Sequence, residues 1–133
     1  KDYIKVLMTQ LYKKYIEKYV KDNNINLHQQ WPEKYAFEEI RFKKYELNNT
    51  DQFKDHVDVK DYNTMKRFLV FFLYLNDNEG GETIFPMCGT SVEPVAGRLA
   101  IWPSGIPFYH CGLPTVKQDK YIITSWFEFL LGL

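Results

Sequence analysis

The chain has 133 residues, 45 % of them hydrophobic and 17 % aromatic, so it can bury the apolar area of one folded domain, predicted to span residues 1–133. Its 17 Lys and Arg residues balance 17 Asp and Glu residues. No net field therefore attracts a nucleic acid or a membrane, and we expect neither as a partner. No segment has the length of a membrane span or the apolar core of a signal peptide, which favours a soluble, cytoplasmic protein.

The cysteines and the first residue add two expectations. Cys88 and Cys111 are the only cysteines, too few for a disulfide framework and without C-x-x-C spacing, so we expect two reduced, buried thiols. The chain begins with lysine and not with methionine, which is compatible with a trimmed chain. The sequence leaves the oligomeric state open, and a monomer is compatible with it.

Residues 1–24 have the pattern of an amphipathic helix. Apolar side chains recur at three- and four-residue spacing, with lysines between them, at Ile4, Leu7, Met8, Leu11, Tyr15 and Tyr19. The run Asp22-Asn23-Asn24 is expected to end the helix. Its lysines could bind a partner, but a solvated face is the more common role of such charges. We predict that this helix packs on a sheet as a buttress.

From residue 37 onward the period changes to short β-like runs separated by Gly, Pro, Asn and Asp. We predict strands at 37–45, 54–59, 67–75, 82–86, 90–93, 98–103, 107–111 and 119–129. Many short strands after one helix indicate a mainly β domain, a barrel or jelly roll with a core at 37–129 and a helical buttress at 1–24.

His56 and Asp58 lie two positions apart in one predicted strand. Because alternate strand residues point to one face, ring and carboxylate would project side by side, about 6.6 Å apart at the backbone. His110 lies in a second predicted strand. Two histidines and one carboxylate form the facial triad of non-haem Fe(II) oxygenases. A bare His-x-Asp is common, however, and alone indicates a hydrogen-bonded strand histidine and a turn carboxylate more often than a metal site.

The last predicted strand places a lysine on an apolar face. Lys120 shares this face with Ile122, Thr124 and Trp126, and the opposite face is also largely apolar, so we expect the strand to be covered on both sides. A buried ammonium loses its hydration and requires an anion, which predicts a carboxylate at Lys120. The alternative is a strand-end lysine that extends into water.

Three segments carry a family resemblance: "FKDHVDV", "RFLVFFLYLNDNEGGETIFP" and "VEPVAGRLAIWPSGIPFYHCGLPTVKQDKYIITSWFEF". In order and spacing they resemble the catalytic core of the prolyl 4-hydroxylase branch of the Fe(II)- and 2-oxoglutarate-dependent oxygenases, over residues 37–129. The resemblance implies the double-stranded β-helix fold, a distorted jelly roll. It also implies that His56, Asp58 and His110 are the catalytic iron ligands. The paired glycines Gly80 and Gly81 match a family turn and are expected to have a structural role.

The resemblance further implies a cosubstrate site. Lys120 stands where the family has a basic residue for the C5 carboxylate of 2-oxoglutarate, which would answer the question of the buried lysine. Thr124 and Tyr74 match hydroxyl groups that assist it, although Tyr74 alone would be an ordinary core aromatic. Tyr45 resembles a tyrosine near the C1 end of 2-oxoglutarate.

Arg67 matches a family arginine near the substrate entrance, Trp126 matches an aromatic residue on the last strand, and the resemblance implies substrate contact for both. Strict alternation places Arg67 on the opposite face from Tyr74, so this role requires a bulge or an early strand start.

Two departures from the family stand near the ligands. Cys111 replaces an alanine after His110, with a thiol expected to face away from the metal, and Phe53 replaces a common tyrosine.

The implied activity is hydroxylation of a C–H bond, first of all in prolyl residues of a peptide or protein, with release of succinate and CO₂. The implied cofactors are Fe(II), 2-oxoglutarate and O₂, with ascorbate as an additional reductant. Asp58 favours hydroxylation, because halogenating relatives replace this carboxylate by a small residue. The alternatives are a free amino acid or another protein side chain as substrate, a non-catalytic jelly-roll binding module, and a cupin-like metalloenzyme that does not use 2-oxoglutarate.

Overall fold

The computed structural model describes residues 2–48 and 50–130. The chain forms two compact units, Lys1–Lys34 and Tyr35–Leu133. The expectation of a single domain stays a prediction. Among the described residues, no helix is both long and apolar enough to cross a membrane.

The first unit contains α1 (Asp2–Asp22) and the short helix α2 (Leu27–Gln30), with the side chain of Asn26 capping α2. Met8, Tyr12 and Ile16 are the buried residues of α1 and follow one another at four-residue spacing, as expected for an amphipathic helix. The buried stripe is narrower than predicted, because Ile4 and Leu7 are exposed. Packing of α1 on a sheet stays a prediction.

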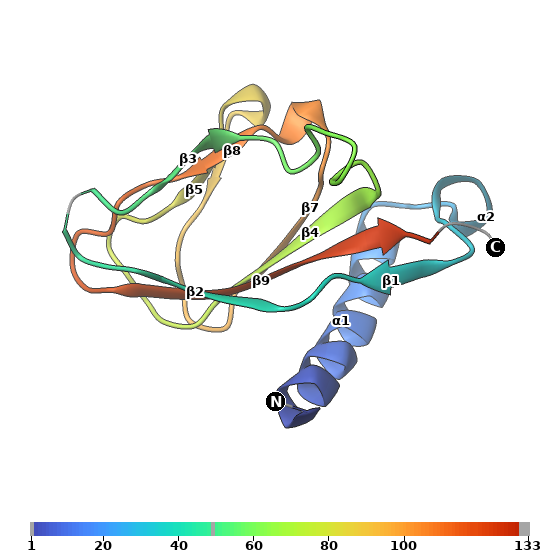
Figure 1. Ribbon diagram of the computed structural model, residues 1–133, viewed down its shortest axis with the longest axis horizontal. Helices are drawn as coiled ribbons and strands as arrows, with labels where there is room; N and C mark the ends of the chain where they lie inside the picture. The colour runs from blue at the N-terminus through green and yellow to red at the C-terminus, as the bar shows by residue number, and fades with distance from the viewer. Residues whose placement is uncertain (1, 49, 131–133) are drawn as a thin grey trace. The chain divides into compact units, whose positions relative to one another are not determined.

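The second unit consists of two antiparallel sheets that face each other (Figure 1). The larger sheet has the order β1-β9-β4-β7, with β2 also paired to β9, and the smaller has the order β3-β8-β5-β6. The strands are β1 (Tyr35–Phe37), β2 (Arg41–Tyr45), β3 (Phe53–His56), β4 (Arg67–Tyr74), β5 (Thr83–Phe85), β6 (Thr90–Val92), β7 (Leu99–Pro103), β8 (His110–Gly112) and β9 (Lys120–Phe129). Two short 3-10 helices, η1 (Pro86–Cys88) and η2 (Ile106–Phe108), connect strands. This is the jelly-roll architecture that the strand pattern predicts.

The core between the sheets is built on the inner faces of β4 and β9. Val70 pairs with Trp126 across these strands and Tyr74 pairs with Ile122, and all four side chains are buried. Phe85, Trp102 and Tyr45 extend this core from other strands. Burying one such side chain contributes about 2 kcal/mol. The inward-pointing residues of β4 and β9 pack against Phe85 of the smaller sheet and so hold the two sheets together.

The strands predicted at 37–45 and 107–111 are each interrupted in the structure. The single strand predicted at 37–45 is divided into β1 and β2, because the four-residue step from Phe37 to Arg41 faces the three-residue step from Phe127 to Thr124 on β9. This extra residue interrupts the pairing near Glu38. The strand predicted at 107–111 is η2 followed by β8, because Pro107 lacks the N–H that a strand interior needs.

The turn before β5 has the backbone angles expected of its glycine pair. Gly80 and Gly81 have φ of 69° and 72°, a region that other residues rarely adopt. A Cβ on Gly80 would also lie 2.5 Å from a side-chain carbon of Val116. The predicted structural role of both glycines is therefore confirmed.

Candidate active site

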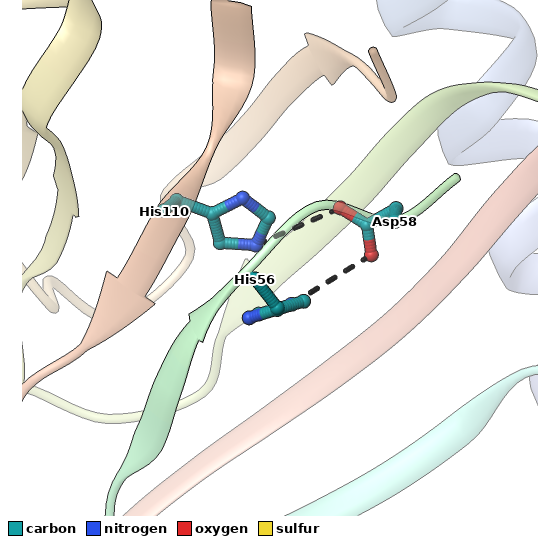
Figure 2. A group of neighbouring side chains, drawn as sticks. All are labelled: His56, Asp58 and His110. Atoms are coloured by element: carbon teal, nitrogen blue, oxygen red, sulfur yellow. Dashed lines mark ion pairs between the residues drawn. The ribbon is translucent and has the colours of Figure 1, made fainter. Parts of the chain in front are cut away.

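His56, Asp58 and His110 form the single group of potential metal ligands found in residues 2–48 and 50–130. His56 ends β3 and pairs directly with His110, the first residue of β8. Figure 2 shows the three side chains pointing toward one another. Nε2 of His56 lies 3.9 Å from Oδ1 of Asp58, and Nε2 of His110 lies 3.6 Å from Oδ2. One potential ligand atom from each residue lies within 4.8 Å of the others.

Asp58 lies outside the strand that was expected to carry it. β3 ends at His56, and its register with β8 shifts between Phe53 and His56, where three steps along β3 face two along β8. The expectation of one regular strand at 54–59 is therefore wrong. The chain leaves the sheet after His56 and still brings the Asp58 carboxylate to the same side as both imidazoles.

The two imidazoles are held in the same way. Nδ1 of His56 lies 2.7 Å from the carbonyl oxygen of Lys54, and Nδ1 of His110 lies 2.7 Å from that of Phe108. Because a carbonyl oxygen can only accept a hydrogen bond, each Nδ1 carries a proton, and Nε2 is the ring nitrogen that faces Asp58. Burial lowers the pKa of His56 and favours its neutral form, in which Nε2 has a free lone pair.

The group has polar atoms that lack protein partners. Nε2 of His56 and Oδ2 of Asp58 are buried and have no hydrogen-bond partner. The distances between the imidazole nitrogens and the carboxylate are too long for good hydrogen bonds. An unpaired buried polar atom costs about 1–3 kcal/mol, and coordination of a divalent cation would remove that cost. Two imidazoles and a carboxylate therefore fit a metal such as Fe(II).

A second layer of contacts holds Asp58 from the larger sheet. Nε1 of Trp126 donates a 3.0 Å hydrogen bond to Oδ1 of Asp58. The guanidinium of Arg67 lies over the Trp126 ring, 4.1 Å from its centroid, and donates to the main-chain oxygen of Asp58. Glu38 accepts two hydrogen bonds from Arg67, at 2.6 and 2.7 Å. Trp126 and Arg67, both expected to contact the substrate, thus lie where they support Asp58.

The bulge that Arg67 needs is present in β4. The register with β9 shifts between Arg67 and Leu69, which pair with Glu128 and Phe127, so Phe68 is the extra residue. The shift turns Arg67 toward Trp126 and the inner face of the sheet. A contact of Arg67 or Trp126 with a substrate stays a prediction.

Substituting Trp126 by phenylalanine tests this support. Trp126→Phe keeps an aromatic ring but removes the hydrogen bond to Asp58, so we expect Mn(II) affinity, measured by calorimetric titration, to fall about tenfold. Trp31→Phe is the control, because Trp31 lies outside the β unit. If Trp126→Phe and the unchanged protein bound Mn(II) with equal affinity, Trp126 would have no role in supporting the metal site.

Lys120 is a buried cation with 1 % of its surface exposed. Nζ donates to the carbonyl oxygen of Gly81 at 3.0 Å and lies 4.6 Å from the ring centroid of Tyr45. No carboxylate among the described residues forms an ion pair with it. A Cβ on Gly81 or Gly112 would lie 3.5 or 3.6 Å from Nζ, so two glycines keep space free beside the ammonium. The prediction that Lys120 is buried and not snorkelling is confirmed, and the site fits a ligand carboxylate.

The charge on Lys120 makes folding depend on pH. Burial lowers the pKa of Lys120 from 10.5 to about 8, so the unfolded chain binds more protons between about pH 8 and pH 10, and stability rises with pH there. At about 1.4 kcal/mol per pKa unit, the full gain is roughly 3 kcal/mol. Urea unfolding of the metal-free protein should show this rise, and Lys120→Met should abolish it. An unchanged slope in that variant would contradict the assignment.

The remaining predicted cosubstrate residues lie on the same inner face. Thr124 is buried on β9. The hydroxyl of Tyr74 lies 2.6 Å from Oγ1 of Thr83, and burial raises its pKa to about 12. Tyr45 pairs with Lys120 across β2 and β9, and its expected place near the C1 end of 2-oxoglutarate stays a prediction. Thr83 was not predicted, although it shares its strand face with buried Phe85.

The departures near the ligands have different surroundings. The Phe53 ring packs on the His56 imidazole, with centroids 4.0 Å apart. The Cys111 thiol is half-buried near Asp55, and burial raises its pKa. Cys88 is exposed, so the expectation of two buried thiols is wrong, although both cysteines are free.

Comparison with a family model extends over most of the chain. The model described as "2OG-Fe(II) oxygenase superfamily" matches residues 40–128. This range contains the three potential ligands and Lys120.

Curated relatives match a shorter segment. The prolyl 4-hydroxylase subunit alpha-1 of Gallus gallus is 33 % identical over 82 residues, and that of Homo sapiens is 32 % identical over 82 residues. These matches cover 55 % of this chain but only 16 % and 15 % of the relatives. The chain therefore spans about a sixth of their length.

Solved structures resemble a larger part of the chain than the curated relatives do. The viral collagen prolyl hydroxylase of Paramecium Bursaria Chlorella virus-1, crystallised with 2OG, has a TM-score of 0.69 and 25 % identity, covering 92 % of this chain and 74 % of its own. A Pseudomonas putida prolyl-4-hydroxylase has a TM-score of 0.60 and 29 % identity, covering 71 % and 54 %. The predicted double-stranded β-helix is confirmed by these likenesses.

Proposed function

The chain belongs to the 2OG-Fe(II) oxygenase superfamily, and from that premise we propose that it hydroxylates prolyl residues of a peptide or protein, with release of succinate and CO₂. The relatives named prolyl hydroxylases support this choice of substrate. One observation carries the proposal: a His-Asp-His group with unpaired polar atoms and the buried Lys120 lie between the same two sheets. No carboxylate in the described part of the chain forms an ion pair with this lysine.

His56, Asp58 and His110 would hold the metal in this proposal. Bound Fe(II), together with 2-oxoglutarate and O₂, supplies the oxidising chemistry for a C–H bond. The carbonyl oxygens of Lys54 and Phe108 keep both Nε2 atoms free to ligate, and Trp126 orients Asp58. The presence of Asp58 supports hydroxylation over halogenation.

Lys120 would bind the C5 carboxylate of 2-oxoglutarate. The ammonium is already desolvated, so little water screens its attraction for a carboxylate beside it. Tyr45 borders the same position, Thr124 is buried on the same face of β9, and Tyr74 with Thr83 adds two hydroxyl groups between the sheets. We place Tyr45 at this C5 end because its ring lies against Nζ of Lys120.

Mass spectrometry of a library of proline-containing peptides tests the proposal. The protein is incubated with Fe(II), 2-oxoglutarate and ascorbate, and we expect one oxygen atom added to selected prolines with an equal amount of succinate. Succinate without any modified peptide would retain the oxygenase and overturn the prolyl substrate, in favour of a free amino acid or another side chain. No succinate from correctly metallated protein would favour a binding module.

A further inference from the structure

Lys43 is a half-buried cation on the inner face of β2. Arg41, Lys43 and Tyr45 alternate along this face, and Lys43 pairs with Ile122 of β9. Nζ of Lys43 lies 4.4 Å from the ring centroid of Phe53 on β3. β2 and β3 each pair with a single strand, so they are edge strands of the two sheets. The contact between Lys43 and Phe53 therefore joins the sheets at one common edge.

The potential metal ligands are most exposed at this edge. The side chain of His56 is 21 % exposed, compared with 6 % for Asp58 and 5 % for His110. Phe53 packs on the imidazole of His56. Phe53 therefore connects the most exposed of the three potential ligands to Lys43.

The charges around Lys43 are not balanced by protein carboxylates. Glu38 accepts two hydrogen bonds from Arg67 and also lies 3.7 Å from Arg41, so two cations share it. No carboxylate of the described chain forms an ion pair with Lys43. Burial and then the charge of Arg41 lower the pKa of Lys43, while Asp58 acts in the opposite direction. A divalent metal would neutralise Asp58 and leave Lys43 without that favourable charge.

We propose that Lys43, assisted by Arg41, binds a carboxylate side chain of the substrate peptide beside the metal centre. The inference deepens the function proposed above and rests on it. It predicts a preference for prolines with an acidic residue nearby. The zero net charge of the chain favours this short-range contact over binding of a nucleic-acid backbone, which depends on an extended positive field.

Paired peptides that differ only in charge test this preference. Fluorescently labelled proline peptides with Glu about three residues or fewer from the proline are compared with their Gln counterparts. Binding is measured by anisotropy with protein loaded with Mn(II) and 2-oxoglutarate in the absence of oxygen. We expect the Glu peptides to bind about tenfold more tightly, as for a partly desolvated ion pair.

Two lysine variants separate the inner face of β2 from its outer face. Lys43→Met should remove most of the preference for Glu. Lys44→Met is the matched control, because Lys44 is exposed and already pairs with Glu46 and Asp119 at 3.3 and 3.4 Å. Its preference for Glu should equal that of the unchanged protein.

Several results would overturn the inference. Equal binding of Glu and Gln peptides would do so, as would equal losses in both lysine variants. A weaker affinity for 2-oxoglutarate in Lys43→Met, with the peptide preference intact, would assign Lys43 to the cosubstrate. Tighter binding of a single-stranded oligonucleotide than of Glu peptides would assign the edge to phosphate. Because binding is measured without turnover, a Lys43-dependent preference in a protein that hydroxylates no proline would overturn only the proposed function.

Discussion

Asp58→Ala is expected to abolish Fe(II)-dependent turnover and to weaken metal binding more than about 100-fold, beyond the loss usual for an outer contact. The substitution removes the only carboxylate of the group and leaves two imidazoles, which carry no negative charge to offset that of a divalent cation. His110→Ala should have the same effect. Calorimetric titration with Mn(II) and assays of succinate formation measure both consequences.

Asp61→Ala is the matched control for Asp58. Asp61 lies three positions along the chain, and its carboxylate bonds with Thr64 in an exposed turn. This variant should bind metal and turn over like the unchanged protein. We expect the Asp58→Ala variant to fold. In the unchanged protein Oδ2 of Asp58 is buried without a hydrogen-bond partner, so removing the carboxylate also removes that cost. Normal turnover in Asp58→Ala or His110→Ala would show that the ligand assignment is wrong.

Lys120→Met is expected to raise the KM for 2-oxoglutarate at least about 100-fold. Removing one partner of a buried ion pair costs about 3–5 kcal/mol, and about 1.4 kcal/mol corresponds to a factor of ten. Methionine is similar to lysine in length but carries no charge, and position 120 is fully buried. We therefore expect the substitution to weaken the binding of 2-oxoglutarate. Succinate formation at varied 2-oxoglutarate measures the KM and kcat separately.

Lys117→Met provides the control for this loss, since Lys117 is exposed and pairs with Glu79 on the surface. Lys120→Arg should recover part of the affinity, because the guanidinium restores the positive charge. An unchanged KM in Lys120→Met would contradict the carboxylate role. That result would favour a metalloenzyme that does not use 2-oxoglutarate.

The long central strands were predictable from the sequence because burial on their faces leaves a clear pattern. The ranges 67–75 and 119–129 differ from β4 and β9 by one residue at one end. Lys120 could be identified as a buried cation because the alternation through Ile122, Thr124 and Trp126 carries it to an apolar face.

Features that depend on an added residue could not be predicted. Alternation alone places His56 and Asp58 on one regular strand, whereas β3 has a register shift against β8 between Phe53 and His56 and ends at His56. Glu38 meets Arg67 across 29 positions of sequence because of irregular pairing on both sides of β9. Such shifts depend on how neighbouring strands fit, and this information is absent from the periodicity of either strand.

The two imidazoles are held by residues close in sequence, whereas the carboxylate is held by a residue distant in sequence. Each histidine is held by a carbonyl oxygen two residues earlier in its own chain segment, while Asp58 is held by an indole 68 positions away. The orientation of each imidazole is therefore fixed within a segment of three residues. The carboxylate depends on correct docking of one sheet against the other. If the two sheets moved apart, the Asp58 carboxylate would lose its alignment before the imidazoles did. The position of the anionic ligand therefore depends on how closely the two sheets pack.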